Sequence, residues 1–201
     1  GEMLLSTIYI QGKAYKIPDI DGLIYNEKSG NPNLPQYSFS VHVPNGKQAQ
    51  IQIEILETQV VNHISIAPSK GVITRDKSPE SIPYEFGDVY NHIEQYPQKI
   101  LKSSESFILR GMIGKRFSLT PFSYLPQSQR LTYTPKVRVT VDFIDNHSRE
   151  LPIASKINSA FTHLFDDVFS NDYELRYDRM EDDGKILIIT SDEYEDAIQP
   201  L

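Results

Sequence analysis

Polar and apolar side chains alternate strictly along the stretch Lys136-Val137-Arg138-Val139-Thr140-Val141-Asp142-Phe143. Successive side chains of a strand point to opposite faces, so this period of two predicts one buried face and one solvated face. Residues 37–43 and 50–55 alternate in the same way. Strands of this kind are typical of an antiparallel sandwich or barrel.

Further strand candidates are weaker. They are rich in β-branched and aromatic residues, and they comprise Leu4–Ile10, Tyr15–Ile20, Ile64–Ala67, Ser106–Arg110 and Arg116–Leu119. Thirteen prolines and the turn clusters at 29–32 and 44–46 interrupt the strands and exclude long helices. We therefore predict a mostly β chain, with a single antiparallel, jelly-roll-like β-sandwich over residues 3–150.

The pattern changes after residue 159. Apolar residues then fall at helical spacing, and they are Phe161, Leu164, Phe165, Val168 and Phe169. This spacing places them on one face of a helix. We expect a short C-terminal helix over 161–169, packed on the sandwich or on a following domain.

The last residues have the pattern of another domain. Lys185–Thr190 is a continuous, β-branched apolar run that suits a strand buried on both faces. Ser191-Asp192-Glu193 then offers an N-cap and acidic first-turn residues, and Tyr194–Ile198 is expected to be helical. A strand followed by a helix opens an α/β unit. We therefore expect residues 1–176 to form the sandwich and its helix, and 177–201 to begin a separate α/β domain of a longer protein.

Composition excludes several functions. The 201 residues contain no cysteine, which excludes disulfides, thiolate metal sites and a cysteine nucleophile within this chain. The net charge is −7 without a basic cluster, so we expect no nucleic-acid partner. No apolar run approaches the roughly 20 residues that span a bilayer, so we expect no membrane span. The start at Gly1 is compatible with a removed secretion signal.

No catalytic, metal or cofactor site is predicted. The five histidines are scattered without metal-binding spacing, and the acidic group Asp142, Asp145 and Asn146 lacks the spacing of a calcium loop. The segment Gly111–Lys115 lacks the context of a phosphate loop, and a hairpin turn explains it better. A structural calcium ion stays open from the sequence.

Several segments together resemble the N-terminal propeptide of the gingipains, which are secreted cysteine peptidases of Bacteroidetes. The resemblance begins near Gly30 and is carried by Ile66–Arg75, Ile82-Pro83-Tyr84, Ser106–Arg110, Val168-Phe169-Ser170-Asn171 and Arg176-Tyr177. It implies a β-sandwich prodomain that assists folding of its peptidase and blocks the active cleft until it is cleaved. The partner would be the chain's own downstream caspase-like peptidase domain, and the location secreted or cell-surface.

The resemblance also implies particular site residues. Family prodomains insert a loop with a basic side chain into the specificity pocket, and matching by position puts that loop at Tyr96-Pro97-Gln98-Lys99. Lys99 is the expected pocket residue, and Gln98 follows if the alignment slips by one residue. Activation cleavage is expected between Arg176 and Tyr177, in a polar linker of the kind that proteases cut, with a secondary cut after Arg75.

Two other interpretations stay open. The first is a stand-alone β-sandwich module for binding carbohydrate or for adhesion, although the chain has no Trp to stack on sugars. The second is the prodomain of a related surface peptidase with a different duty. A His and a Cys in an α/β context beyond residue 201 would separate a prodomain from a binding module.

Overall fold

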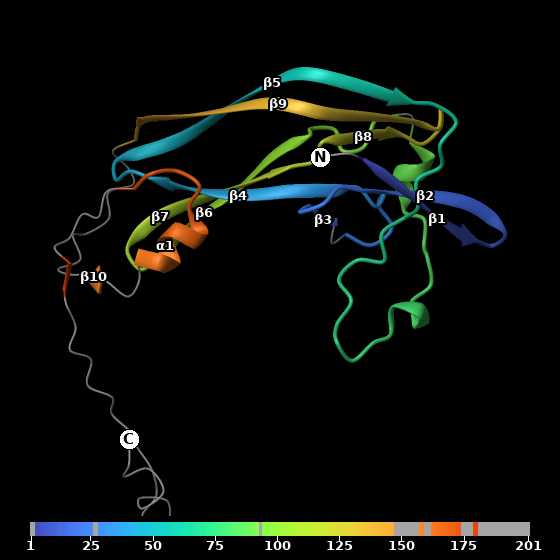
Figure 1. Cartoon of the computed structure of the whole chain (residues 1–201), viewed down its shortest axis with the longest axis horizontal. Helices are drawn as coiled ribbons and strands as arrows, with labels where there is room; N and C mark the ends of the chain where they lie inside the picture. Colours follow the sequence, from blue (N-terminus) through green and yellow to red (C-terminus); the bar gives the residue numbers. More distant parts are fainter. Residues whose placement is uncertain are drawn as a thin grey trace, which may run out of the picture.

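A computed structural model describes residues 3–25, 28–92, 94–146, 157–158, 162–173 and 179–180. Two antiparallel sheets lie face to face in it (Figure 1). The four-stranded sheet has the order β3-β4-β7-β6, with bounds β3 (Ile24–Tyr25), β4 (Pro35–Val43), β6 (Leu101–Leu109) and β7 (Met112–Leu119). The three-stranded sheet has the order β5-β9-β8, with bounds β5 (Lys47–Val61), β8 (Phe122–Leu125) and β9 (Arg130–Asp145). The predicted antiparallel β-sandwich is confirmed.

The N-terminal strands are a departure from the single sandwich that the sequence predicts. β1 (Leu4–Ile10) and β2 (Lys13–Asp19) pair only with each other, as a separate two-stranded antiparallel sheet. The described pair β10 (Ile157–Asn158) and β11 (Arg179–Met180) is parallel and two residues long. The sandwich proper therefore runs from β3 to β9.

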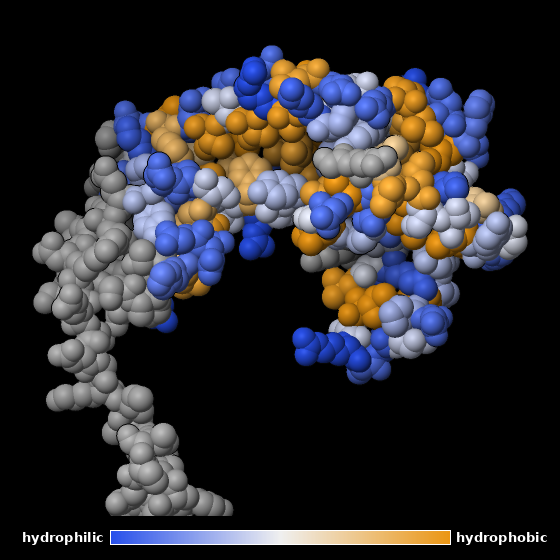
Figure 2. Space-filling model, viewed as in Figure 1, coloured by the Kyte–Doolittle hydropathy of each residue, from blue (hydrophilic) through white to orange (hydrophobic). Residues whose placement is uncertain are grey.

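The alternating stretches face each other across the sandwich. Val41, Val43, Ile113 and Phe117 of the four-stranded sheet form a core cluster against apolar residues of β5 and β9, which are Ala49, Ile51, Val141 and Phe143. The apolar positions from Val137 to Phe143 are half-buried while the polar positions between them are exposed, as the period of two requires. Figure 2 shows apolar side chains gathered beneath β5 and β9 on the face in view.

A second core closes the other end of the sandwich. It joins strand residues of β8 and β9 to segments between strands, and its buried members are Ile20, Leu34, Ile64, Ile66, Phe122, Tyr124, Leu131 and Tyr133. The sequence predicts Ile64–Ala67 as a strand, and this is wrong. The segment makes only a single bridge to Lys16, because its other backbone groups bond to individual loops and tyrosine hydroxyls.

A long loop leaves this second core and projects away from the sandwich (Figure 1). We call residues 70–87 the arm; it contains the short 3-10 helix η1 (Pro79–Ser81), and η2 (Asp88–Asn91) follows it. The neck of the arm is tight, because a Cβ on Gly87 would lie 2.9 Å from the Gly30 carbonyl oxygen. The Gly87 amide donates a 2.9 Å hydrogen bond to that same oxygen.

The C-terminal helix α1 (Thr162–Val168) packs on the outer face of the four-stranded sheet. Phe165 and Phe169 are buried there with Met112, so the helix packs on the sandwich. Leu164 is 37% exposed, so it does not share the buried face that the helical spacing assigns to it. The reason is that Phe165 and Phe169 occupy the contact with Met112, and Leu164 lies about 100° around the helix from Phe165. Phe161 lies outside the described residues.

Several other predictions also fall outside the described residues. These are the linker around Arg176 and Tyr177, the apolar run Lys185–Thr190, and the helix expected over Tyr194–Ile198. The boundary between 1–176 and 177–201 therefore stays a prediction.

Candidate functional site

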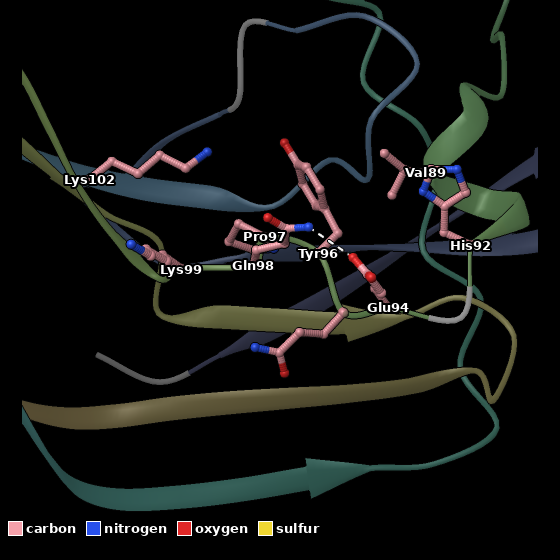
Figure 3. A pocket seen from close by; sticks show the side chains of 9 residues that line it. Val89, His92, Glu94, Tyr96, Pro97, Gln98, Lys99 and Lys102 are labelled. Carbon is pink, nitrogen blue, oxygen red and sulfur yellow. Dashed lines mark hydrogen bonds between the residues drawn. The ribbon is translucent and has the colours of Figure 1, made fainter.

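The predicted loop Tyr96-Pro97-Gln98-Lys99 lies between η2 and β6, at the mouth of a hollow of about 370 Å³ (Figure 3). The lining residues belong to one continuous segment, and they are Val89, His92, Glu94, Gln95, Tyr96, Pro97, Gln98, Lys99 and Lys102. The structure thus brings all four predicted loop residues together around one concavity.

Tyr96 is the inner anchor of this loop. Its amide donates a 2.8 Å hydrogen bond to the Tyr124 carbonyl oxygen, and the Tyr124 amide donates a 2.7 Å bond in return. This pair forms an isolated antiparallel bridge between the loop and β8. The Tyr96 side chain packs against the second core, and its hydroxyl accepts a 3.1 Å hydrogen bond from the Asn31 side-chain amide.

The remaining loop residues differ in their exposure. Pro97 is buried and follows a cis peptide bond. Gln98 is exposed, and its Nε2 donates a 2.8 Å hydrogen bond to Glu94 Oε2. Lys99 is exposed as well. Of the four predicted residues, Gln98 and Lys99 are the ones whose side chains are exposed.

The outer end of the loop is also held. The Thr120 amide donates a 2.7 Å hydrogen bond to the carbonyl oxygen of Ile100, directly before β6 begins. The chain from Pro97 to Lys99 therefore runs between two backbone anchors, with Pro97 buried and Gln98 and Lys99 exposed. A short segment that is fixed at both ends loses little conformational entropy when it enters a cleft.

The hollow carries basic groups on an acidic protein. Lys99 and Lys102 lie at one end of it in Figure 3 and His92 lies at the other, while Glu94 is engaged by Gln98. The chain as a whole has a net charge of −7. Among the described residues, no group of three or more His, Cys, Asp and Glu side chains could hold a metal ion.

Arg75, the predicted secondary cut, sits on the arm. It is exposed within a turn that the Lys77 amide closes with a 3.0 Å bond to the Thr74 carbonyl oxygen. The Thr74 side chain holds the pKa of the Asp76 carboxyl below its usual range by hydrogen bonding to it. Arg75 does not line the hollow, so the structure separates it from the loop at Lys99.

The base of the arm is fastened by one lysine. Lys70 Nζ donates a 2.6 Å hydrogen bond to the Pro79 carbonyl oxygen and lies 4.2 Å from the centroid of the Tyr84 ring. Cations over aromatic faces are attracted by the ring quadrupole. The arm is therefore an ordered element that presents Arg75 at an exposed turn.

Sequence reasoning misses two residues of the site, Asn31 and Tyr124. Asn31 belongs to the turn cluster at 29–32, where asparagine is ordinary, and Tyr124 is one of twelve tyrosines. No spacing rule connects either residue to Tyr96, because both contacts depend on tertiary folding. Burial raises the pKa of Tyr124, whose hydroxyl donates to the Ile64 carbonyl oxygen at 3.2 Å.

In the part of the chain that the structure describes, no helix is both long enough and apolar enough to cross a bilayer.

Comparisons with known proteins agree with the geometry. A family model described as Propeptide_C25 matches residues 9–180. Gingipain R2 of Porphyromonas gingivalis (strain ATCC BAA-308 / W83) is 30% identical over 184 residues, which cover 89% of this chain and 25% of that protein. Gingipain R1 of Porphyromonas gingivalis is 26% identical over 181 residues, covering 89% of this chain and 18% of that protein. The chain thus spans a quarter or less of these relatives.

Solved structures show the same likeness. The complex of the pro- and mature domains of RgpB from Porphyromonas gingivalis matches with a TM-score of 0.68 at 27% identity, covering 84% of this chain and 86% of that chain. A structure described as an insight into the zymogenic latency of gingipain K, from the same organism, matches with a TM-score of 0.60 at 17% identity. That match covers 71% of this chain and 82% of the other, and it concerns the fold alone.

Proposed function

The chain belongs to the propeptide family of the C25 cysteine peptidases, and we propose that it holds its own downstream peptidase inactive until it is cut away. The chain has no cysteine, so it is not itself the catalytic unit. Its role in this proposal is that of an inhibitor and folding partner of a gingipain-like domain. The same family membership supports a secreted or cell-surface location for the parent protein.

One observation carries the inhibitory part of the proposal. The loop at Pro97–Lys99 runs between backbone anchors at Tyr96 and Ile100, and its exposed side chains are those of Gln98 and Lys99. A prodomain must place a substrate-like segment in the cleft without becoming a good substrate. A rigidly held loop fulfils this need, because its backbone resists the adjustment that cleavage requires.

Lys99 is the residue proposed to fill the specificity pocket. Its ammonium group would pair with an acidic group of the peptidase, and the short loop would desolvate both charges. Gln98 is the second choice, although its side chain is bonded to Glu94 in the free chain. Arg176 at the proposed junction favours a peptidase that prefers arginine, which the loop lacks, so a pocket that accepts either basic side chain is part of the proposal.

A pair of substitutions tests this assignment. Lys99→Ala is expected to weaken inhibition of the mature peptidase by about 2–5 kcal/mol, because a desolvated charge pair is lost. Lys102→Ala is the matched control, since Lys102 lines the same hollow but stands in β6 beyond the outer anchor, and little change is expected. Equal inhibition constants for wild type and Lys99→Ala would remove Lys99 from the mechanism.

The domain boundary and the activation site form the second part of the proposal. Residues 1–176 would be the propeptide and 177–201 the start of the peptidase domain, with cleavage after Arg176 giving a mature chain that starts at Tyr177. The apolar run Lys185–Thr190, whose pattern suits a strand buried on both faces, supports this partition because the described sandwich is antiparallel. N-terminal sequencing of the activated parent protein tests the cut, and a start elsewhere rejects it.

The alternative of a stand-alone carbohydrate or adhesion module has no observation in its favour beyond the sandwich itself. The family match and the likeness to a prodomain complex both support the propeptide proposal.

A further inference from the structure

A hydrogen bond joins the loop to a segment far away in the sequence. The Asn31 side-chain amide donates to the Tyr96 hydroxyl at 3.1 Å, across 65 residues of sequence. Asn31 is 7% exposed, and Tyr96 is half-buried against the second core. A hydrogen bond in such surroundings is shielded from competing water, so its loss weakens the link between Asn31 and the loop.

Asn31 is itself held firmly in place. Its carbonyl oxygen accepts a 2.7 Å hydrogen bond from the Ser69 amide, and the preceding Gly30 amide donates a 2.9 Å bond to the Ser69 carbonyl oxygen. Gly30 has φ +81°, and a Cβ there would lie 3.1 Å from the Gly87 amide nitrogen. The turn that carries Asn31 is therefore clamped between both sides of the arm's neck.

Tyr96 connects this fixed turn to the loop. Its backbone makes the two-way bridge to Tyr124, which is 2% exposed and whose hydroxyl contacts the backbone of Ile64 and Ile66. Only the three residues Pro97 to Lys99 separate Tyr96 from Ile100, the outer anchor at Thr120. A shift of Tyr96 would consequently move Lys99.

We infer that Asn31 and Tyr96 are positioning residues of the inhibitory loop, which set the direction in which Lys99 leaves the sandwich. This inference rests on the proposed function of Lys99. It also gives Tyr96 a role as an anchor inside the prodomain, in place of a contact within the peptidase cleft. The loop is thus held by backbone anchors at both of its ends and by the distant turn that carries Asn31.

A first experiment tests the anchoring without any peptidase. Amide hydrogen exchange is measured by NMR in the 201-residue chain and in its Tyr96→Phe variant, which removes only the hydroxyl. The amides of Tyr96, Tyr124 and Thr120 donate the hydrogen bonds that form the two anchors. We expect these amides to exchange several-fold faster in the variant, while the exchange rates of the β5 and β9 amides stay unchanged.

Tyr90→Phe is the matched control for this experiment. It removes a hydroxyl from the same core, one that donates a 3.0 Å hydrogen bond to the Ile66 carbonyl oxygen rather than to a loop residue. The three anchor amides are expected to keep their exchange rates in this control. Unchanged rates in Tyr96→Phe, or the same acceleration in Tyr90→Phe, would overturn the anchoring role.

A second experiment links the anchor to Lys99 through a double-mutant cycle. Inhibition of the parent's mature peptidase is measured for wild type, Tyr96→Phe, Lys99→Ala and the double variant. We expect Tyr96→Phe to raise the inhibition constant about two- to tenfold in the wild-type background and to have no further effect in the Lys99→Ala background. Asn31→Ala is expected to behave like Tyr96→Phe, and the two together like either alone.

The outcomes separate the inference from the function on which it rests. If Lys99→Ala inhibits as well as wild type, the proposed role of Lys99 fails, and the exchange rates still decide whether Tyr96 is anchored by Asn31. If Lys99→Ala loses inhibition but Tyr96→Phe adds the same factor in both backgrounds, the positioning role is refuted and the function stands.

Discussion

The side chain of Asn171 pairs with the backbone of His42 as a neighbouring strand would. Its Oδ1 accepts a 2.8 Å hydrogen bond from the His42 amide, and its Nδ2 donates a 3.1 Å bond to the His42 carbonyl oxygen. The preceding residue continues the pattern, because the Ser170 amide bonds to the Ser40 carbonyl oxygen at 2.8 Å. Residues 169–171 thus form a clasp over the open edge of β4. Covering an exposed edge protects a sheet from pairing with other chains.

Removing the clasp is expected to destabilise the sandwich. Asn171→Ala deletes both hydrogen bonds and leaves the amide and carbonyl of the buried His42 without these partners, so the free energy of unfolding should fall by about 1–3 kcal/mol. Urea denaturation measures the change. The neighbouring exposed residue gives a control, since Asp172→Ala is expected to stay within about 0.5 kcal/mol of wild type. Equal stability of the two variants would show that the clasp contributes nothing.

The packing of α1 depends on the absence of a side chain at Gly114. A Cβ there would lie 2.3 Å from Phe107 Cζ, and the Phe107 ring stacks on Phe169 with 6.3 Å between centroids. Gly114→Ala should displace this ring and cost about 1–3 kcal/mol in unfolding free energy. In a Phe107→Leu background the cost of Gly114→Ala should shrink, because the ring that meets the new methyl group is gone. The same cost in both backgrounds would contradict this packing.

Stability should fall at alkaline pH through tyrosine ionisation. Burial, together with the hydrogen bond that the Tyr25 hydroxyl donates to Asp19 Oδ1, raises the pKa of Tyr25 to about 12. A folded-state pKa above the unfolded value of about 10 gives stability that is complete below pH about 10 and lost as pH rises through about 12. Tyr25→Phe should therefore lose less unfolding free energy than wild type between about pH 9 and about pH 12. A Tyr25→Phe profile parallel to wild type would contradict the raised pKa.

The arm should be the first described part of the chain that a protease cuts. Arg75 is exposed in a turn beyond the neck, and we expect brief trypsin digestion to give a fragment that starts at Asp76. The two pieces should remain associated, because backbone hydrogen bonds of the neck at Ser69 and Gly87 lie on both sides of the cut. Mass spectrometry and size-exclusion chromatography test both points. Separation of the pieces after the cut would show that the neck is weaker than its bonds indicate.

Deletion of the C-terminal residues tests whether they belong to a separate domain. Deleting residues 184–201 should leave the free energy of unfolding of the sandwich unchanged, because the sequence pattern of that segment is typical of a strand and a helix of another core. A loss of cooperative unfolding after this deletion would reject the two-part organisation.

The sequence predicted those strands in which one side chain in two is buried, such as Val137–Phe143, because alternation follows directly from strand geometry. It failed at Ile64–Ala67, where tyrosine hydroxyls and single loop amides replace a neighbouring strand. These hydroxyls belong to Tyr90 and Tyr124, which are far from this segment in sequence, so no local sequence pattern predicts the contacts. The exposure of Leu164 was missed for a similar reason, since the position of a short helix is set by the sheet beneath it.

The candidate loop was located through a family resemblance rather than through residue chemistry. Nothing in the sequence distinguishes Lys99 from the other lysines, and its setting emerges only when the loop is folded over the second core. The anchor residue Asn31 could not be identified from its turn cluster either, because its contact with Tyr96 also forms only in the folded chain.

The central claim is that this chain inhibits the peptidase it precedes. The direct measurement is a titration of the active peptidase of the parent protein, freed of its propeptide, with the intact wild-type 201-residue chain, following hydrolysis of a peptide substrate. The claim predicts competitive inhibition that becomes complete near one chain per enzyme. Full activity in the presence of a large molar excess of folded chain would contradict it.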